Sequence, residues 1–216
     1  MKKGIVTGIT MGEPAGIASE ITLKVWKNHR KKIEPFIFFG DSDHLLKTSS
    51  KLKFKIPIKK INKISECFKI FKNYLPVYDI KLNQKVKFGY PSSANSREIL
   101  ASINKVVKFA SKKEISCIVT NPVEKNIIRK KQKNFTGHTF YIAKLLDVKK
   151  PVMLLTSPKI SVVPITQHLS LRKALKAINK KLIVSTAKIT NKYLKIFFGK
   201  KKTKNCNCKF KSTCRR

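Results

Sequence analysis

The sequence has few acidic residues and no long apolar run. Only 11 Asp and Glu stand against 49 Lys and Arg, which gives a formal net charge of +38. No stretch of 18 or more apolar residues occurs, so we expect no transmembrane helix and no membrane partner. The start of the chain is too short for a signal peptide and is interrupted by Glu13 and Pro14, so we predict a first strand and a cytoplasmic protein. With 42% hydrophobic residues, 216 residues suffice for one large domain or two small ones.

The excess of lysine admits two interpretations. A charge of +38 is typical of proteins that bind nucleic acid or anionic membranes. However, Lys, Asn, Ile and Phe, all abundant here, can be written with A- and T-rich codons. The lysines are spread along the whole chain without interleaved aromatic residues, so we favour codon bias over a nucleic-acid partner. Small phosphorylated substrates would still be attracted by the field.

Strand and helix patterns alternate along the chain. Apolar runs at residues 3–11, 36–40 and 115–119 predict buried strands, and residues 18–27 and 95–112 predict amphipathic helices. Shorter strands are predicted at residues 55–58, 77–82, 152–155 and 160–164, and further helices from a cap at Asp41 or Ser42 to about residue 52 and at residues 64–71, 140–146, 171–178 and 181–198. This alternation predicts an α/β fold with a largely parallel sheet.

The stretch 134–139 contains the strongest candidate site. It follows the predicted strand 115–119 and the turn signal Thr120-Asn121-Pro122. Ligands of open α/β sheets bind beyond the carboxyl ends of the strands, where Gly137-His138-Thr139 offers an imidazole, a hydroxyl and accessible backbone. The alternative is a helix start, in which Thr139 caps the helix 140–146 and His138 is a polar loop residue. The tripeptide alone favours that alternative.

A glycine turn at residues 12–17 lies between the first predicted strand and helix. Strand, glycine turn and helix can bind phosphate at the helix N-terminus, but a tight structural turn explains the residues equally well. Ser19 is a possible N-cap of the helix. The turn lacks the G-x-G-x-x-G pattern, so it indicates no dinucleotide.

The four histidines fall into two pairs. His29 and His44 lie near predicted helix ends, and we assign both to the solvated surface. His138 and His168 each follow a predicted strand and can face one cleft. Two imidazoles are a partial metal site, because catalytic metals generally take three protein ligands, and a third is not evident in this chain.

The five cysteines indicate neither a disulfide framework nor a zinc site. Cys67 and Cys117 are isolated and are predicted to be small buried apolar residues. Cys206, Cys208 and Cys214 crowd into the last eleven residues, where their C-x-C…C spacing fits no common zinc pattern.

Several stretches in order, residues 11–17, 20–21, 120–125, 137–139 and 166–169, resemble one family. They are similar to the motifs of 4-hydroxythreonine-4-phosphate dehydrogenases of vitamin B6 biosynthesis, and the resemblance runs from residue 3 to about residue 199. Mild departures occur at the first turn. Glu13 stands where the family usually has Asp, and Ala18 and Ser19 replace its usual Gly-Pro.

The resemblance implies an oxidoreductase of pyridoxal phosphate biosynthesis. It implies oxidation of 4-phosphooxy-L-threonine, a small phosphorylated amino acid, with NAD and a divalent metal (Zn, Mg or Co), followed by loss of carbon dioxide. It also implies a homodimer and a fold like that of isocitrate and isopropylmalate dehydrogenases, with two domains around a cleft. His138 and Thr139 match the family's substrate-binding pair, and His168 matches one of its three metal ligands. No catalytic residue is assigned.

The family motif Asn-Pro-His-Ala-Gly-Glu, which carries a second metal histidine, is absent from this chain, as are the later basic residues and much of the nicotinamide site. One permitted codon series for residues 202–216, read one base later, encodes a strand-like segment followed by Asn-Pro-His-Ala-Gly. We therefore expect residues 1–199 to be the family-like region, with a two-domain split that the sequence does not resolve. Residues 200–216 would be an out-of-frame basic tail, so we expect a fold that is incomplete at its C-terminus and inactive.

Overall fold

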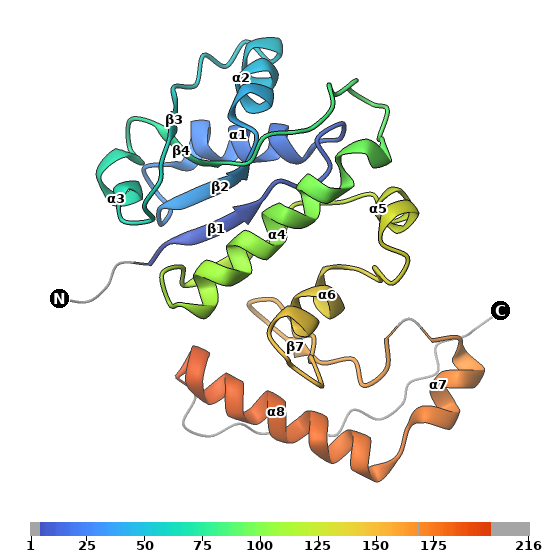
Figure 1. Cartoon of the computed structure of the whole chain (residues 1–216). Coiled ribbons are helices and arrows are strands. Elements are labelled where there is room, and N and C mark those ends of the chain that lie inside the picture. The colour runs from blue at the N-terminus through green and yellow to red at the C-terminus, as the bar shows by residue number, and fades with distance from the viewer. Residues whose placement is uncertain (1–4, 168, 200–216) are drawn as a thin grey trace. The chain divides into compact units, whose positions relative to one another are not determined.

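The computed structural model of the chain describes residues 5–167 and 169–199 (Figure 1). The chain forms two compact units, Met1–Lys149 and Lys150–Arg216. Residues 200–216, where we predict an out-of-frame tail, lie outside the described residues.

The first unit is built on a five-stranded sheet with the order β3-β4-β2-β1-β5. Every pairing in it is parallel, which confirms the predicted largely parallel α/β fold. The strands are β1 (Thr7–Thr10), β2 (Phe36–Gly40), β3 (Ile58–Lys60), β4 (Leu75–Asp79) and β5 (Cys117–Val119).

Helices of this unit alternate with the strands. They are α1 (Ala18–His29), α2 (Ser42–Lys51), α3 (Glu66–Ile70), α4 (Ser96–Ser111), α5 (Lys125–Lys131) and α6 (His138–Leu145), with the 3-10 helix η1 (Ser93–Asn95) before α4. The longest, α4, packs across β1, β2 and β5, and Figure 1 shows it in front of the strands with α1 behind them. The predicted helix at residues 95–112 is confirmed.

The core of the first unit lies around the central strand β2, whose five residues are all buried. Phe39 stacks on Tyr78 with ring centroids 5.2 Å apart, and the ring of Phe109 from α4 lies 5.9 Å from Phe39. The apolar stripe of α4 closes the core from one side, with Ile99 and Ile103 fully buried. A strand that is apolar on both faces is typical of a central strand in a parallel sheet, so the sequence pattern and the packing agree.

The predicted burial of residues 115–119 is largely wrong. Ile115 is buried, but Cys117 and Val119 are exposed and Ile118 is half-buried. The reason is topological, because β5 is the edge strand of the sheet and has a described neighbour, β1, on one side only. Cys67 is buried as predicted, and burial raises the pKa of its thiol to about 12.

Two strand boundaries differ from the prediction. The strand predicted at 55–58 is observed at Ile58–Lys60, and the strand predicted at 77–82 is Leu75–Asp79. Lys53 and Lys55, which follow α2, adopt left-handed backbone conformations with φ of 54° and 49°. A left-handed backbone conformation changes the direction of the chain, so the strand begins only after these residues, at Ile58.

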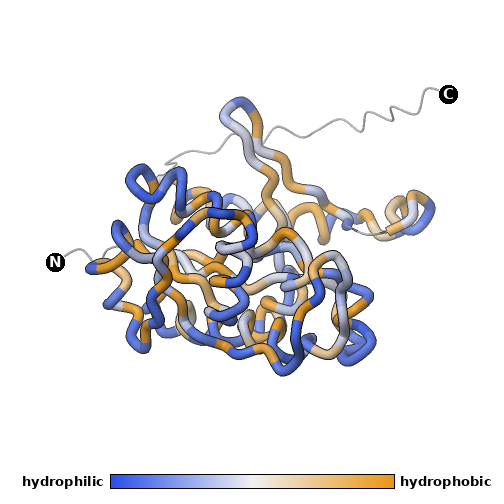
Figure 2. Tube along the Cα trace, turned by 90° about the horizontal axis from the view of Figure 1, so that it is seen from above, coloured by the Kyte–Doolittle hydropathy of each residue, from blue (hydrophilic) through white to orange (hydrophobic). Residues whose placement is uncertain are grey.

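The second unit contains β6 (Leu155–Thr156), β7 (Ser161–Val162), α7 (Leu171–Ala177) and α8 (Lys180–Phe198). The two short strands pair antiparallel and overlap the predicted strands at residues 152–155 and 160–164 only in part. Within the part of the chain that the structure describes, no helix is long and apolar enough to cross a membrane. Figure 2 shows hydrophilic residues distributed along the drawn chain rather than gathered in one block.

Candidate functional site

The carboxyl ends of β1 and β5 form the point where the topology of the sheet divides. From β1 the chain continues to β2 on one side, whereas β5 pairs with β1 on the other side. Ligands of open α/β sheets bind at such a point, outside the carboxyl ends of the strands. The segments that leave there are the β1–α1 turn and the residues from Thr120 to the start of α5.

The β1–α1 turn is held closely against the end of β5. Gly12 has φ of 71°, and a Cβ added to it would lie 2.6 Å from Cβ of Asn121, so only glycine fits. The N–H of Glu13 donates to the carbonyl oxygen of Pro122 at 2.8 Å, and the N–H of Gly89 donates to Ala15 at 2.8 Å. The turn predicted from its glycines is therefore fixed by backbone contacts from two directions.

Asn121 joins β5 to β1 and to α1. Its side-chain amide donates to the carbonyl oxygen of Thr10 at 2.9 Å and to the hydroxyl of Thr22 at 3.0 Å. Its backbone N–H donates to the hydroxyl of Thr10 at 3.0 Å. All three residues are buried, so these bonds fix the path of the chain that leads into α5.

Glu13 is a buried carboxyl group in this turn, with only 6% of the residue exposed. Its Oε1 accepts the N–H of Ala15 at 3.1 Å, and its Oε2 has no hydrogen-bond partner among the described residues. Burial raises the pKa of Glu13, the Ala15 hydrogen bond opposes this, and the charge of Glu124 adds to the rise. The sequence marked the turn but gave no sign that its carboxyl group is buried.

His138 and Thr139 lie in the first turn of α6, after an N-cap at Gly137. The alternative in which Thr139 caps a helix that starts at residue 140 is not observed, because α6 already begins at His138, with Gly137 (φ of 140°) as its N-cap. His138 is half-buried, its ring meets the edge of Phe135 at 6.3 Å, and its Nε2 is buried without a hydrogen-bond partner among the described residues.

The electrostatic environment of His138 favours the neutral imidazole. Burial lowers its pKa, and the positive charge of Lys125 lowers it further. A Cβ added to Gly137 would lie 3.7 Å from Nζ of Lys125, so the ammonium group of α5 lies against the start of α6. Lys125 belongs to the stretch 120–125 that carries the family resemblance, but its approach to the start of α6 was not predicted from the sequence.

His44 is not on the surface, so that prediction is wrong; His29 is exposed as predicted. Asp41 caps α2 by accepting the N–H groups of Asp43 and His44, and this places the His44 ring against Phe88 with centroids 5.5 Å apart. Only 8% of His44 is exposed, and burial lowers its pKa.

The carboxylates of Asp41, Asp43 and Asp79 lie close together near the carboxyl ends of β2 and β4, where lysine side chains pair with them. Lys81 lies 2.5 Å from Asp43, 3.5 Å from Asp79 and 3.8 Å from Asp41, and Lys60 lies 3.1 Å from Asp79. The hydrogen bond to Asp43 raises the pKa of Lys81 to about 12. We therefore interpret this cluster as a satisfied ion-pair network.

The predicted metal ligand, His168, lies outside the described residues, so its role stays a prediction. Among residues 5–167 and 169–199, no three His, Cys, Asp or Glu side chains come close enough together to hold a metal ion. One histidine is too small a donor set for a catalytic metal.

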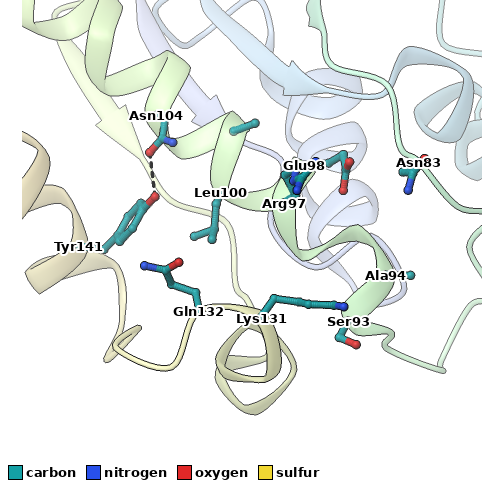
Figure 3. Close-up of a pocket in the computed structure, with 11 residues that line it drawn as sticks. Asn83, Ser93, Ala94, Arg97, Glu98, Leu100, Asn104, Lys131, Gln132 and Tyr141 are labelled. Carbon is teal, nitrogen blue, oxygen red and sulfur yellow. Dashed lines mark hydrogen bonds between the residues drawn. The ribbon is translucent and has the colours of Figure 1, made fainter.

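A polar pocket of about 740 Å³ opens on the first unit between η1, α4, α5 and α6 (Figure 3). In Figure 3 Lys131 extends toward Ser93, and Tyr141 donates to Asn104 at 2.9 Å. The lining carries two cations, three amides and one carboxylate: Arg97, Lys131, Asn83, Asn104, Gln132 and Glu98. No local sequence pattern predicts this pocket, because its lining residues come from η1, α4, α5, α6 and the loops that contain Asn83 and Gln132.

Comparison with known proteins identifies the family. The family profile described as "Pyridoxal phosphate biosynthetic protein PdxA" matches residues 31–206 of the chain. The chain belongs to the PdxA family. The family resemblance read from the motifs is therefore confirmed.

Relatives of known name support the same conclusion. The chain is 31% identical over 199 residues to the 4-hydroxythreonine-4-phosphate dehydrogenase of Methylorubrum extorquens, covering 88% of the chain and 57% of the relative. It is 34% identical over 204 residues to that of Bradyrhizobium diazoefficiens, covering 88% and 59%. The chain therefore spans rather more than half the length of these relatives.

Solved structures show the same fold. The crystal structure of a 4-hydroxythreonine-4-phosphate dehydrogenase from Burkholderia phymatum matches with a TM-score of 0.80 at 24% identity, covering 89% of this chain and 59% of that one. The enzyme from Klebsiella pneumoniae matches with a TM-score of 0.80 at 22% identity, covering 89% and 60%. The expected dehydrogenase-like α/β fold, present in part, is confirmed.

Proposed function

We propose that the chain carries the substrate-binding part of a PdxA-type dehydrogenase that oxidises and decarboxylates 4-phosphooxy-L-threonine. The observation that carries the proposal is the Gly137-His138-Thr139 segment at the start of α6, with an imidazole nitrogen that lacks a partner among the described residues. Family membership supplies the reaction class, and the relatives bear the name of this dehydrogenase.

His138 and Thr139 would bind the polar groups of the substrate. Because burial and Lys125 lower the pKa of His138, its imidazole is neutral near pH 7 and has one nitrogen free to accept a hydrogen bond or a proton from a hydroxyl group. The Thr139 hydroxyl can donate or accept a hydrogen bond beside it. In the complete enzyme NAD would supply the hydride acceptor. A divalent metal, with His168 as one of its ligands, would supply the Lewis acid that polarises a substrate oxygen.

Activity requires more than the 216 residues under this proposal. The cofactor-binding residues and two metal ligands are expected in the part of the relatives that the chain does not span. We propose a frameshift near residues 200–202 as the origin of the tail, and a cytoplasmic homodimer as the complete form. Sequencing the gene across codons 195–216 and beyond tests the frameshift; tail codons that forbid the alternative frame would contradict it.

Two polypeptides test the function directly: the 216-residue chain and a longer one translated from the alternative frame. NADH formation from 4-phosphooxy-L-threonine with a divalent metal is expected for the longer polypeptide only. His138→Gln in the longer polypeptide is expected to lower kcat/KM at least tenfold, whereas His29→Gln, an exposed histidine, is the matched control. Robust NADH formation by the 216-residue chain would contradict the proposal that this chain binds the substrate but lacks the residues needed for turnover.

A second candidate function is ligand binding without catalysis, favoured by the pocket in Figure 3. Arg97 and Lys131 offer positive charge there beside amide and hydroxyl groups, a combination suited to a phosphorylated ligand. Thermal stabilisation of the chain by phosphorylated ligands without turnover would support it. Loss of that stabilisation in Arg97→Ala, but not in Arg172→Ala on α7, would place the ligand in this pocket.

A further inference from the structure

The polar pocket beside α4 contains charged groups of both signs. Arg97 and Glu98 come from α4, and Lys131 comes from the last turn of α5 and extends toward Ser93 (Figure 3). The pocket volume of about 740 Å³ is in the range of sites that bind small molecules. His138 is not among the lining residues, so the pocket is distinct from the predicted substrate-binding pair.

Glu98 is the residue of this pocket that indicates a ligand. It is half-buried, and its Oε2 is shielded from solvent without a hydrogen-bond partner among the described residues. None of the ion pairs found within residues 5–167 and 169–199 includes Glu98. Arg97 precedes it directly, but adjacent positions on a helix do not face each other, so Arg97 does not supply the missing donor. A carboxylate withdrawn from water without a donor is unfavourable, and a cationic donor in the pocket would satisfy it.

The other lining groups indicate what such a ligand carries besides a cationic group. Arg97 and Lys131 are exposed and by themselves need no partner. In one pocket with Glu98, however, they provide a place for an acidic group of the same ligand. Further donors and acceptors come from three amides, those of Asn83, Asn104 and Gln132. This lining therefore fits a small molecule that has both an ammonium group and an acidic group.

Hydrogen bonds between separate elements hold the walls of the pocket in place. Tyr141 of α6 donates to Asn104 of α4 at 2.9 Å. The loop that contains Asn83 is tied to η1 by two hydrogen bonds between Gln84 and Asn95, of 2.9 and 3.0 Å. Walls that are ordered before binding lose little conformational freedom when a ligand enters, which favours affinity.

We propose that this pocket binds a small zwitterionic ligand, an α-amino acid or its phosphate ester, with the ammonium group at Glu98 and the acidic group at Arg97 and Lys131. The inference rests on the second candidate function, ligand binding in this pocket, and adds the chemical class of the ligand. It gives Glu98 a role that a site for phosphate alone would not require.

Isothermal titration calorimetry of the 216-residue chain tests the inference with O-phospho-L-serine and racemic 3-phosphoglycerate at constant ionic strength. The two molecules differ at one group, which is an ammonium group in the first and a hydroxyl group in the second. 3-Phosphoglycerate has the larger negative charge, so attraction by a chain of +38 alone would favour it. We expect the opposite order, with O-phospho-L-serine binding saturably and roughly tenfold more tightly.

L-Serine distinguishes the two forms of the ligand, because it lacks only the phosphate group. An affinity comparable with that of O-phospho-L-serine would identify the free amino acid as the ligand class. A much lower affinity would identify the phosphate ester.

Glu98→Gln keeps the size of the side chain and removes its charge, so it is expected to abolish the preference for O-phospho-L-serine over 3-phosphoglycerate. Glu114→Gln, which removes an exposed carboxylate outside the pocket, is the matched control and should retain the preference. Lys131→Met is expected to weaken the binding of O-phospho-L-serine, whereas Lys130→Met, at an exposed lysine outside the lining, should not. Far-UV circular dichroism checks each fold, and Glu98→Ala replaces Glu98→Gln if that variant is misfolded.

Two results would overturn the inference: binding of 3-phosphoglycerate as tight as that of O-phospho-L-serine, or a preference that persists in Glu98→Gln. Binding that is lost in His138→Gln but unchanged in Glu98→Gln would also overturn it, because the ligand would then lie at the first turn of α6.

Failure of the inference is distinguishable from failure of the second candidate function. If both phosphorylated ligands bind equally and Arg97→Ala weakens both, the pocket binds phosphorylated ligands without recognising the ammonium group. Absence of binding by all three ligands would reject the inference and the second candidate function together.

Discussion

The two units of the chain differ sharply in how much they bury. In the first unit the side chains of β2 and the apolar stripe of α4 are withdrawn from water, and Phe39 and Ile103 are fully buried. In the described part of the second unit only Thr186 is buried, while Phe197 is 73% exposed. Since burial of apolar surface is the main favourable term in folding, we expect the first unit to be the more stable of the two.

The low burial in the second unit is consistent with a chain that spans only part of the length of its relatives. The chain covers 57% of the Methylorubrum extorquens protein and 59% of the Burkholderia phymatum structure. Exposed apolar residues on α8, such as Ile196 and Phe197, are typical of a surface that packs against further protein. We infer that the second unit requires a covering surface to become stable.

The largest expected effect comes from separating the units. Residues 1–149 alone are expected to unfold cooperatively in urea, whereas residues 150–216 alone are expected to show no cooperative transition, because they bury too little apolar surface. Circular dichroism against urea concentration measures both. A sigmoidal transition for residues 150–216 would show that the second unit is also stable by itself and would contradict the expected difference between the units.

Truncating one aromatic residue in each unit sharpens the same contrast. Phe39→Ala is expected to lower the free energy of unfolding by about 3–5 kcal/mol, because it removes a fully buried ring that packs on Tyr78 and Phe109. Phe197→Ala, at a residue that is 73% exposed, is expected to change it by less than about 0.5 kcal/mol. Comparable losses in the two variants would show that α8 is buried in solution.

The sequence predicted the first unit well because its periodic patterns reflect burial. The apolar run of β2 and the stripe of α4 were read correctly, since a buried strand and an amphipathic helix leave a direct trace in residue order. Cys117 was read wrongly because an apolar run does not reveal whether its strand is central or at the edge. That depends on the strand order, which arises only from tertiary pairing.

The candidate site was predicted only in part. The motif with His138 and Thr139 was visible in the sequence, but the burial of Glu13 and His44 and the approach of Lys125 to Gly137 were not. These features depend on contacts between segments that are distant in the chain. Asn121 is 111 residues from Thr10, and no local pattern announces a hydrogen bond across such a separation.

A smaller effect is expected at the joint between β1 and β5. Asn121→Ala removes two side-chain hydrogen bonds and leaves the carbonyl oxygen of Thr10 without its donor in a buried place, at a cost of about 1–3 kcal/mol. Urea denaturation measures the loss, with the exposed Asn73→Ala as the matched control. If the two variants were equally stable, the joint would contribute nothing to the first unit.

The smallest effect is expected in the pH dependence of the first unit. The pKa of Glu13 is raised above its ordinary value of 4.5 in the folded chain, so the folded state holds this proton more tightly than the unfolded state. The stability linked to Glu13 is therefore fully present below about pH 4.5 and is lost as the pH rises through the folded pKa. Glu13→Gln, which stays neutral, should remove this dependence.

His44 and His138 change the stability of the folded chain with pH in the opposite direction to Glu13, in a pH range near 6.5. Burial lowers the pKa of both, so the stability linked to them is present above about pH 6.5 and is lost as the pH falls through their folded pKa values. The difference between the parent chain and Glu13→Gln, measured by urea denaturation at each pH, cancels the histidine contributions and isolates Glu13. The exposed Glu34→Gln controls for the loss of one carboxylate. A difference that does not change with pH would show that the carboxyl group of Glu13 is hydrated, and that the β1–α1 turn is more open than its backbone contacts imply.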